Sequence, residues 1–565
     1  MSNSSVDICG HPVPKWALIA GGVAVSTGVA YIGYKNLYPS DQTKSNSKTN
    51  SSTIKKGTQA PVISDEPKSA AEVIEDLKSK GNDFFKQKKF KEAIDFYTKG
   101  ILLCPANEKK TLSALYQNRA AAHENLGNYD SVLEDTNSAL EIVPNYVKAI
   151  ARRAKAYEQK GQLDLALQDV TACCIFENFA NQSTLMSADR VLKALGAQHA
   201  KEEMSKRSFF KPSKQFIKTY LKSFPNDPIL QPDVLSNGLT NGAVEQIDLD
   251  LLAKGKRAFE QEDYLLAIKY CTEEIESPSS SSHNKALAKL LRASMYIFTS
   301  QSTKAKEDLN DIIEDPAVDS KVKVNAHIKR AAIHLHASSD FEKAFEDLEA
   351  AEKVDPSVAD SYYQRGQIFC LFGKYDEALD NFDKTLSFNP NFVIARAQRY
   401  FVLHKKIVPG DVQGMEKSVT EFRQFVNANE NCSEACTLFA QVLVEQEDFE
   451  GAEEYFKRSI KVDPANASLY VHRAMLVLQA RGNIDEAIKL IMKAIDIDKS
   501  CLFAYETLGT IEVQRGRLEE AVKCFDKALP LAKDEAELSH IYSLRDAAIA
   551  QMRVCERYNI KVPSM

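Results

Sequence analysis

The stretch from Ser361 to Pro390 reads SYYQRGQIFCLFGKYDEALDNFDKTLSFNP and decides the fold. Its apolar residues form two stripes at helical spacing on either side of Gly373, so the stretch predicts two helices joined by a short turn. Gly366 and Ala378 let these helices approach each other closely, and Pro390 ends the second helix because it lacks a backbone N–H. The predicted building unit is therefore a hairpin of two helices.

The same pattern returns 34 positions away and recurs along the chain. It consists of a small residue, an Ala twelve positions later, a large apolar residue four further on and a Pro after another eight. One hairpin cannot bury its own faces, whereas stacked hairpins can, so the copies predict a superhelix with a concave groove. About eleven copies fit between Ala71 and Ala532 at this period. The clearest copies are Gly81, Ala93, Tyr97 and Pro105; Ala332, Ala344, Leu348 and Pro356; Gly366, Ala378, Phe382 and Pro390; and Ala440, Ala452, Phe456 and Pro464.

These residues resemble the tetratricopeptide repeat. Any helical protein has Ala and Leu at similar spacings, but a common register in several copies argues against chance. The resemblance implies an all-α fold in which the first helix of each hairpin lines the concave groove.

Charge is distributed unevenly along the 565 residues, which are too many for a single core. The net charge of −6 does not suggest a nucleic-acid partner. Residues 1–247 carry 31 basic and 26 acidic side chains, whereas the remaining residues carry 41 and 52. The second part of the chain is therefore an acidic array.

The sequence contains no pattern that predicts a metal site, a cofactor or catalysis. The eleven cysteines include no Cys-x2-Cys pair, and no His cluster has metal-ligand spacing. Scattered cysteines are typical of helical cores in a reducing compartment. No Gly-rich phosphate-binding loop is present, and the residues after His123-Glu124 do not have the zinc-protease spacing. We expect a protein that is not an enzyme.

A second feature stands near the N-terminus, where residues 16–34 read WALIAGGVAVSTGVAYIGY without a charge. Nineteen helical residues span about 28 Å, close to the hydrocarbon thickness of a bilayer. Residues 15–36 are therefore predicted to form a transmembrane anchor. A cleaved secretory signal is the rival interpretation, but only one basic residue, Lys15, precedes the apolar stretch.

Flanking charges predict the orientation of this anchor. Six lysines but only three acidic residues follow the span before residue 70. The positively charged side of a span stays in the cytoplasm. The short tail of residues 1–14 should therefore lie on the far side of the membrane, and the repeats should face the cytosol. Residues 37–70, rich in Ser, Thr, Asn and Lys, are predicted to be a disordered linker.

Two blocks of repeats follow the linker. Residues 71–205 should hold three repeats and an extra helix, and residues 247–565 should hold the longer array, capped by a helix from Asp534 to Arg557. Residues 206–246 contain several prolines and form the expected connection. Within it, KRSFFKPSKQFIKTYLK (residues 206–222) is basic with interleaved aromatics, so it is either a docked linker or a surface for lipid.

Five polar residues of the first block stand at groove positions of successive first helices. They are Lys78 with Asn82, then Asn118, then Lys148 with Arg152. Residues four apart share one helical face. Cations with amide donors around one groove suit a ligand with two carboxylates.

These segments, LKSKGNDFF, LYQNRAAAH and VKAIARRAKAY, resemble the dicarboxylate clamp of tetratricopeptide co-chaperones. The resemblance implies that all five residues bind the C-terminal Glu-Glu-Val-Asp peptide of cytosolic heat-shock chaperones. The second block lacks this set: Asp360, Glu434 and Phe503 stand where the first block has Lys148.

The acidic array suggests a different groove. Mitochondrial presequences are basic amphipathic segments, so their groove should offer carboxylates beside apolar surface. The candidates are Asp360, Glu434 and Glu506 with Phe369, Leu438 and Phe503. The alternative is that these acidic residues only keep a long helical array soluble.

Anchor, linker, clamp and long array together resemble the large tetratricopeptide receptor of the mitochondrial outer-membrane protein translocase, in its fungal form by length and layout. The resemblance implies an outer-membrane receptor that accepts hydrophobic precursor proteins from chaperones and passes them to other translocase subunits. Other classes are a soluble co-chaperone adaptor, which would lack the anchor, and an enzyme carrying repeats, which would need a catalytic domain. A receptor anchored in another organelle, such as the endoplasmic reticulum, is the remaining alternative.

Overall fold

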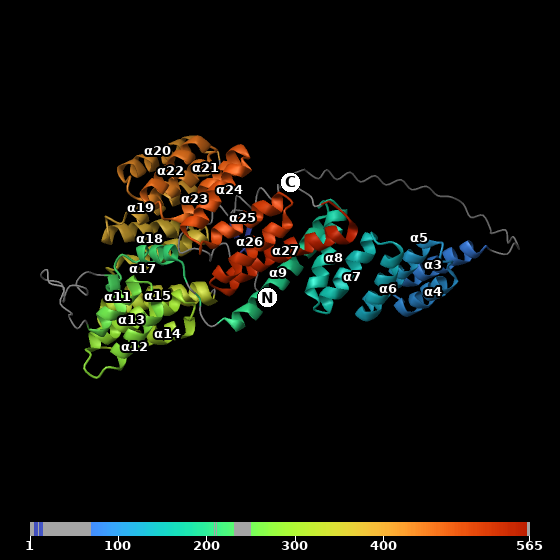
Figure 1. Cartoon of the computed structure of the whole chain (residues 1–565), viewed down its shortest axis with the longest axis horizontal. Coiled ribbons are helices and arrows are strands. Elements are labelled where there is room, and N and C mark those ends of the chain that lie inside the picture. Colours follow the sequence, from blue (N-terminus) through green and yellow to red (C-terminus); the bar gives the residue numbers. More distant parts are fainter. Residues whose placement is uncertain are drawn as a thin grey trace. The chain divides into compact units, whose positions relative to one another are not determined.

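The computed structural model describes residues 5–8, 11–14, 69–207, 210, 212–230, 250–338, 340–408 and 410–561 (Figure 1). Its helices form eleven hairpins, in which the two helices of each hairpin pack against each other. The expected tetratricopeptide superhelix is confirmed for these residues. One small departure from an all-α chain is an antiparallel pair of strands, β1 (Ser5–Ile8) and β2 (His11–Pro14).

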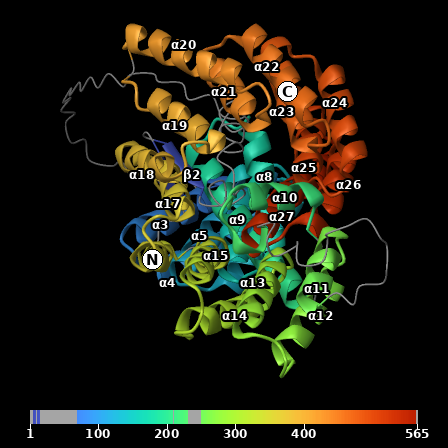
Figure 2. The ribbon, with the colours of Figure 1, turned by 90° about the vertical axis from the view of Figure 1, so that its left-hand side faces the viewer.

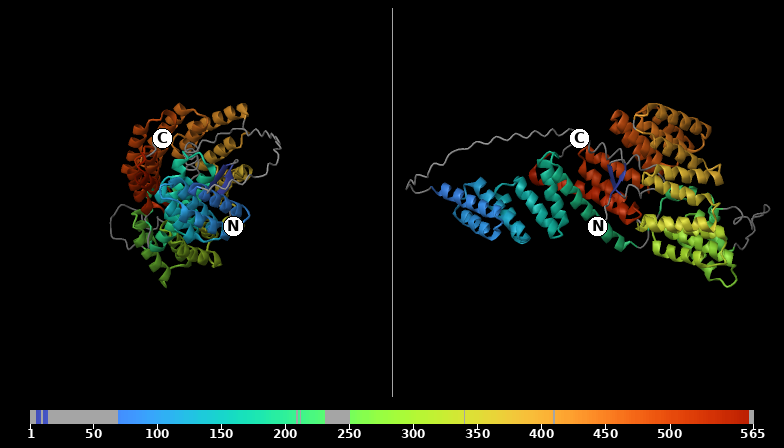
Figure 3. Two further views of the ribbon diagram at one scale, coloured as in Figure 1. Left: turned by 90° about the vertical axis from the view of Figure 1, so that its right-hand side faces the viewer. Right: turned by 180° about the vertical axis from the view of Figure 1, so that it is seen from behind.

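The first array consists of three hairpins and one longer helix, and its successive hairpins lie side by side (Figure 3). Its helices are α3 (Ala70–Lys86), α4 (Phe90–Leu103), α5 (Lys109–Asn125), α6 (Tyr129–Ile142), α7 (Val147–Gln159), α8 (Leu163–Phe176) and α9 (Gln182–Lys206).

The second array consists of eight hairpins, preceded by a short helix, α10, and followed by a long one, α27. Its elements are α10 (Lys214–Lys222), the 3-10 helix η1 (Pro228–Leu230), α11 (Leu251–Glu260), α12 (Tyr264–Glu276), α13 (Ser282–Phe298), α14 (Ser302–Glu314), α15 (Ser320–Ser338), α16 (Phe341–Val354), α17 (Ala359–Leu371), α18 (Tyr375–Phe388), α19 (Val393–Lys405), α20 (Val412–Ala428), α21 (Ser433–Glu445), α22 (Phe449–Val462), α23 (Ala467–Arg481), α24 (Ile484–Ile497), α25 (Leu502–Gln514), α26 (Leu518–Ala528), the 3-10 helix η3 (Leu529–Leu531) and α27 (Glu535–Tyr558).

The C-terminal helix α27 differs from the cap that the sequence predicted for the second array. Its residues from Tyr542 onward belong to the same compact unit as the first array. Val554 and Cys555 pack in one core with Ala149 and Ile150 of α7. Because these apolar contacts need a partner from the far end of the chain, hairpin periodicity could not predict them.

The repeat pattern acts through one recurring contact between a small residue and a large ring. A Cβ atom on Gly81 would lie 2.5 Å from the Tyr97 ring, and one on Gly366 would lie 2.9 Å from the Phe382 ring. Such distances are too short for any side chain, so glycine lets the second helix place its ring against the backbone of the first. Tyr97 and Phe382 are buried as a result.

A mostly buried arginine that the repeat pattern did not predict connects three helices in several repeats. Arg119 of α5 donates from Nε and Nη2 to Asp135 of α6, over 3.0 and 2.6 Å, and from Nη1 to Thr98 of α4 over 3.0 Å. Each such arginine therefore joins its own hairpin to the preceding one. We call this contact the arginine bridge. Its members are Arg119 with Asp135 and Thr98, Arg153 with Asp169 and Asn137, Arg292 with Asp308 and Thr272, and Arg330 with Asp347 and Asn310.

Arg153→Ala is expected to lower the free energy of unfolding by about 3–5 kcal/mol, because the buried Asp169 carboxylate loses both of its 2.7 Å bonds. Replacing the pair together, by Arg153→Met with Asp169→Leu, should recover most of this loss, since no charge is then left unpaired. Urea unfolding followed by circular dichroism measures both changes. A double variant as unstable as Arg153→Ala would contradict the bridge as the source of the effect.

Candidate peptide-binding sites

The five clamp residues lie on the first helices of the three hairpins of the first array. Lys78 and Asn82 are on α3, Asn118 is on α5, and Lys148 and Arg152 are on α7. All five side chains are at least partly exposed. Ligand binding by these residues stays a prediction.

Hydrogen bonds connect the clamp residues of neighbouring hairpins. Asn118 Nδ2 donates to Asn82 Oδ1 over 3.1 Å, and the Tyr97 hydroxyl donates to the same oxygen over 2.8 Å. Arg152 Nη1 donates to the backbone carbonyl of Gln117 over 3.3 Å, which links α7 to α5. The structure therefore brings Asn82, Asn118 and Arg152 together from three separate helices.

The clamp arginine already holds a carboxylate of the chain, that of Glu124. Arg152 Nε lies 2.7 Å from Glu124 Oε2, and Lys155 Nζ lies 2.7 Å from Glu124 Oε1. Burial raises the pKa of Glu124, but the hydrogen bonds from Lys155 and Arg152 outweigh it and leave the pKa below its usual value. Glu124 therefore stays charged and orients the guanidinium.

Sequence reasoning missed Lys155 and Glu124 as parts of this site. Lys148, Arg152 and Lys155 follow one another at spacings of four and three, so they share a helical face, and this spacing was a usable signal. Glu124 carried no such signal because it reaches Arg152 from the preceding hairpin. The arrangement can bind carboxylates, as its contact with Glu124 demonstrates.

Two of the six candidate residues for a precursor groove do not line an open surface. Asp360 of α17 and Leu438 of α21 are both 0% exposed. Asp360 accepts hydrogen bonds from the backbone N and side-chain Nδ2 of Asn226, over 3.0 and 2.7 Å. Burial raises the pKa of Asp360 to about 6, although the hydrogen bonds from Asn226 act to lower it. The expectation that both residues face an accessible groove is therefore corrected. The segment around Asn226 covers Asp360, and Leu438 is buried in the apolar core that its hairpin forms with Phe422 and Phe439.

The other four candidates are at least partly exposed, and each has a partner inside the second array. Glu434 Oε1 lies 2.5 Å from Lys222 Nζ, and Glu506 Oε1 lies 2.8 Å from His540 Nε2. Phe369 packs beside Phe345, with ring centroids 5.1 Å apart.

The last of the four, Phe503, packs beside the buried His472, with ring centroids 5.2 Å apart. Burial lowers the pKa of His472 to about 4, so this ring is neutral at pH 7 and adds no charge to the groove.

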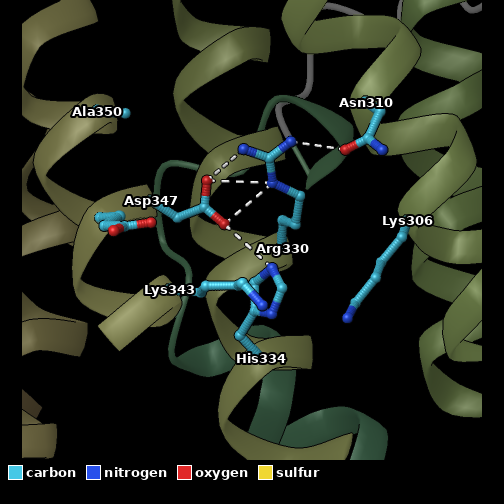
Figure 4. A pocket seen from close by; sticks show the side chains of 8 residues that line it. Lys306, Asn310, Arg330, His334, Lys343, Asp347 and Ala350 are labelled. Atoms are coloured by element: carbon cyan, nitrogen blue, oxygen red, sulfur yellow. Dashed lines mark hydrogen bonds and ion pairs between the residues drawn. The ribbon is translucent and has the colours of Figure 1, made fainter. Parts of the chain in front are cut away.

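A cavity of about 450 Å³ lies among α14, α15 and α16 (Figure 4). Arg330 occupies its wall and donates to Asp347 and to Asn310, which makes it one of the arginine bridges. His334 Nε2 lies 3.8 Å from Asp347 Oδ2. Burial and the charge of Lys306 lower the pKa of His334. The charges that line this cavity thus serve packing between hairpins.

Comparison with known proteins decides the family. The mitochondrial import receptor subunit TOM70 of Homo sapiens is 39% identical to this chain over 495 residues, which are 86% of the chain and 81% of that protein. The chain belongs to the TOM70 family of mitochondrial import receptors. The family expected from the sequence is therefore confirmed.

Other similarities are more distant or cover less of the chain. The crystal structure of yeast Tom70 is 22% identical and covers 87% of this chain and 99% of its own, with a TM-score of 0.49. The TOM70 of Saccharomyces cerevisiae is 24% identical to this chain over 526 residues, so the curated sequences do not single out the fungal form. The Hsp70/Hsp90 co-chaperone CNS1 of Saccharomyces cerevisiae is 31% identical over 185 residues, which are 33% of this chain and 45% of that protein.

Two family models match parts of the second array. Residues 359–392 match the tetratricopeptide repeat, and residues 394–544 match the C-terminal ARM domain of tetratricopeptide repeat protein 21. The first of these spans the hairpin of α17 and α18, which contains the stretch that decided the fold.

Among the described residues, no helix is both long and apolar enough to span a membrane. The anchor predicted at residues 15–36 and nearly all of the linker predicted at residues 37–70 lie outside the described residues. Both stay predictions.

Proposed function

We propose that this TOM70-family receptor binds the C-terminal Glu-Glu-Val-Asp peptide of cytosolic heat-shock chaperones at its five clamp residues. In the same proposal the second array accepts precursor proteins from the chaperone and passes them to other subunits of the outer-membrane translocase. Binding alone performs this role. The proposal therefore assigns no catalytic step, metal, cofactor or nucleic-acid partner.

The observation that carries the clamp is the proximity of its residues on three hairpins: Asn118 bonds Asn82, and Arg152 bonds the backbone carbonyl of Gln117, next to Asn118. The amides of the two asparagines offer N–H donors, and Lys78, Lys148 and Arg152 offer positive charge. Bonds between ionised partners are about twice as strong as neutral ones, so two ligand carboxylates would find strong contacts here. Arg152 already donates to Glu124 and to the Gln117 carbonyl, and Lys78 pairs with Glu75 over 2.5 Å, so a ligand carboxylate would compete with these contacts.

The similarity to CNS1, which is named as an Hsp70/Hsp90 co-chaperone, supports the same ligand class. The five residues match the co-chaperone clamp in residue type and in repeat register. Ordinary surface composition would not be expected to produce all five matches.

Precursor binding by the second array rests on its charge. Residues 248–565 carry 52 acidic and 41 basic side chains. Basic amphipathic segments are typical of mitochondrial presequences, so this array suits them as a partner. The candidates on its first helices that are at least partly exposed are Glu434, Glu506, Phe369 and Phe503.

The proposal also includes an anchor at residues 15–36 that crosses the mitochondrial outer membrane once, with the N-terminus in the intermembrane space and the repeats in the cytosol. Lysines after the apolar stretch support this orientation.

Arg152→Ala should weaken binding of a Glu-Glu-Val-Asp peptide about tenfold or more, because it removes a charge-assisted bond of about 1.5–3 kcal/mol. Lys78→Ala and Asn118→Ala should act in the same direction, and affinity should fall with added salt. Calorimetry with the peptide measures these changes. Lys160→Ala is the matched control, since this cation of the same array pairs with Asp130 away from the clamp. Unchanged affinity in all three clamp variants would contradict the assignment of these residues as the peptide-binding site.

A fusion of residues 1–40 to a fluorescent protein should localise to mitochondria. Protease added to intact mitochondria should digest the full chain from the linker onward, because the lysine-rich flank stays in the cytosol. Immunoblotting of the repeats before and after opening of the outer membrane gives the result. Repeats that resist protease until the membrane is opened would show that the orientation is wrong.

A further inference from the structure

Residues Ser213–Leu230, here called the inner segment, lie against the second array although they precede its first hairpin. They comprise α10 (Lys214–Lys222) and η1 (Pro228–Leu230). Helix α10, with the sequence KQFIKTYLK, is basic on one face and apolar on the other. Phe216 and Tyr220 of α10 pack on Phe298 of α13, with ring centroids 6.1 and 5.0 Å away.

The inner segment runs across the first helices of several hairpins. Asn325 of α15 donates to the backbone carbonyl of Asn226 over 3.4 Å, and Gln364 of α17 donates to that of Ser223 over 3.2 Å. Glu434 of α21 lies 2.5 Å from Lys222 Nζ. First helices line the inner face of a tetratricopeptide superhelix, so the segment occupies this face, as Figure 2 shows for α10.

The residues that hold the inner segment stand at the clamp positions of the repeat. Asp360 and Glu434 have the register of Lys148, and Gln364 has the register of Arg152. The second array therefore binds a basic segment of its own chain at the positions where the first array carries its clamp.

The two ends of the inner segment are held with unequal strength. Near η1, Asp227 Oδ2 lies 2.6 Å from Lys329 Nζ, and these side chains are 1% and 0% exposed. At α10, Lys218 lies 2.9 Å from Asp463 and Lys222 lies 2.5 Å from Glu434, and these lysines are 48% and 36% exposed. Solvent screens exposed pairs, so the ion pairs of α10 are weaker than the buried pair near η1, and α10 is held mainly by its apolar face, through residues such as Ile217.

The packing of α10 also leaves a polar group unsatisfied. The Tyr220 hydroxyl is buried and has no hydrogen-bond partner within the part of the chain that the structure describes. Burial without a partner costs free energy that returns when the hydroxyl meets water. If α10 swings away from the array about the backbone that follows Lys222, this hydroxyl reaches water while Asp227 stays bound to Lys329.

We propose that α10 is a built-in occupant of the inner face and must detach before a basic amphipathic helix of a precursor binds there. This inference rests on the proposed role of the second array as the precursor site. The incoming helix has the chemistry of α10 itself, and Glu434 and Asp463 exchange the lysines of α10 for those of the precursor. Only chains with a free inner face can bind the precursor. The apparent affinity is therefore the intrinsic affinity multiplied by the fraction of chains in which α10 is detached.

The test uses the full chain with Lys218→Glu and Lys222→Glu together, which turns both ion pairs into repulsions. The probe is a dye-labelled basic amphipathic peptide without acidic residues, and fluorescence anisotropy gives its affinity. The double variant should bind the probe at least about threefold more tightly than the unmodified chain, because a larger fraction of chains has a free inner face. The matched control is Lys269→Glu with Lys417→Glu, which makes the same charge change on exposed lysines of α12 and α20.

Each outcome decides one question. Equal gains in the double variant and the control would mean that added negative charge alone attracts the probe, and would overturn the occlusion by α10. Probe binding at the unmodified affinity in the double variant would overturn it as well, while leaving the precursor site intact. A probe that binds neither the unmodified chain nor any variant would refute the precursor site itself. Circular dichroism shows whether the reversed charges disturb folding. If they do, the milder pair Lys218→Gln with Lys222→Gln takes their place and should also raise the affinity for the probe.

Discussion

Each arginine bridge ties a first helix to its own second helix and to the hairpin before it. In α7, Arg153 points into this bridge, toward Asp169 and Asn137. Successive residues of a helix are rotated by about 100°, so the neighbouring Arg152 is directed away from the bridge. Arg119 and Asn118 stand in the same relation on α5. In these four repeats the bridge therefore fixes the rotation of the first helix, and this rotation decides which of its side chains reach the inner face.

The two arrays use that inner face with opposite charge. The first array presents Lys148 and Arg152, of which Arg152 holds the Glu124 carboxylate. The second array presents Asp360 and Glu434 at the register of Lys148. Asp360 and Glu434 bind a basic segment of the chain itself. One repeat geometry thus serves two kinds of peptide, because only the residues at the groove positions change.

Much of this architecture could be predicted from the sequence, since it depends on local spacing. The pairing of Gly366 with Phe382 and the placement of the five clamp residues on first helices both follow from the repeat register. The arginine bridge also has a spacing in the sequence, an Arg with an Asp sixteen residues later in three repeats, but the pattern of small and apolar residues that defines the repeat does not include these positions.

Contacts between distant residues could not be predicted. The buried pair of Lys329 with Asp227 joins residues 102 positions apart, and no periodic pattern relates them. Because of Pro212 and Pro225, the sequence predicted an irregular connection here. It left two interpretations, a linker docked on the repeats and a surface that contacts lipid. The structure shows that residues 213–222 are docked on the second array, and the segment that follows them covers Asp360.

The central claim is that both inner faces are peptide-binding surfaces, and that α10 fills the second one. Hydrogen exchange of the full chain, followed by mass spectrometry, tests it most directly, because it reports the protection of each helix with and without peptide. A basic amphipathic peptide should speed exchange in residues 214–222 while α15 and α17 stay protected. A Glu-Glu-Val-Asp peptide should slow exchange in α3, α5 and α7 instead. A bound basic peptide that leaves exchange of residues 214–222 unchanged, or slows it, would contradict the account.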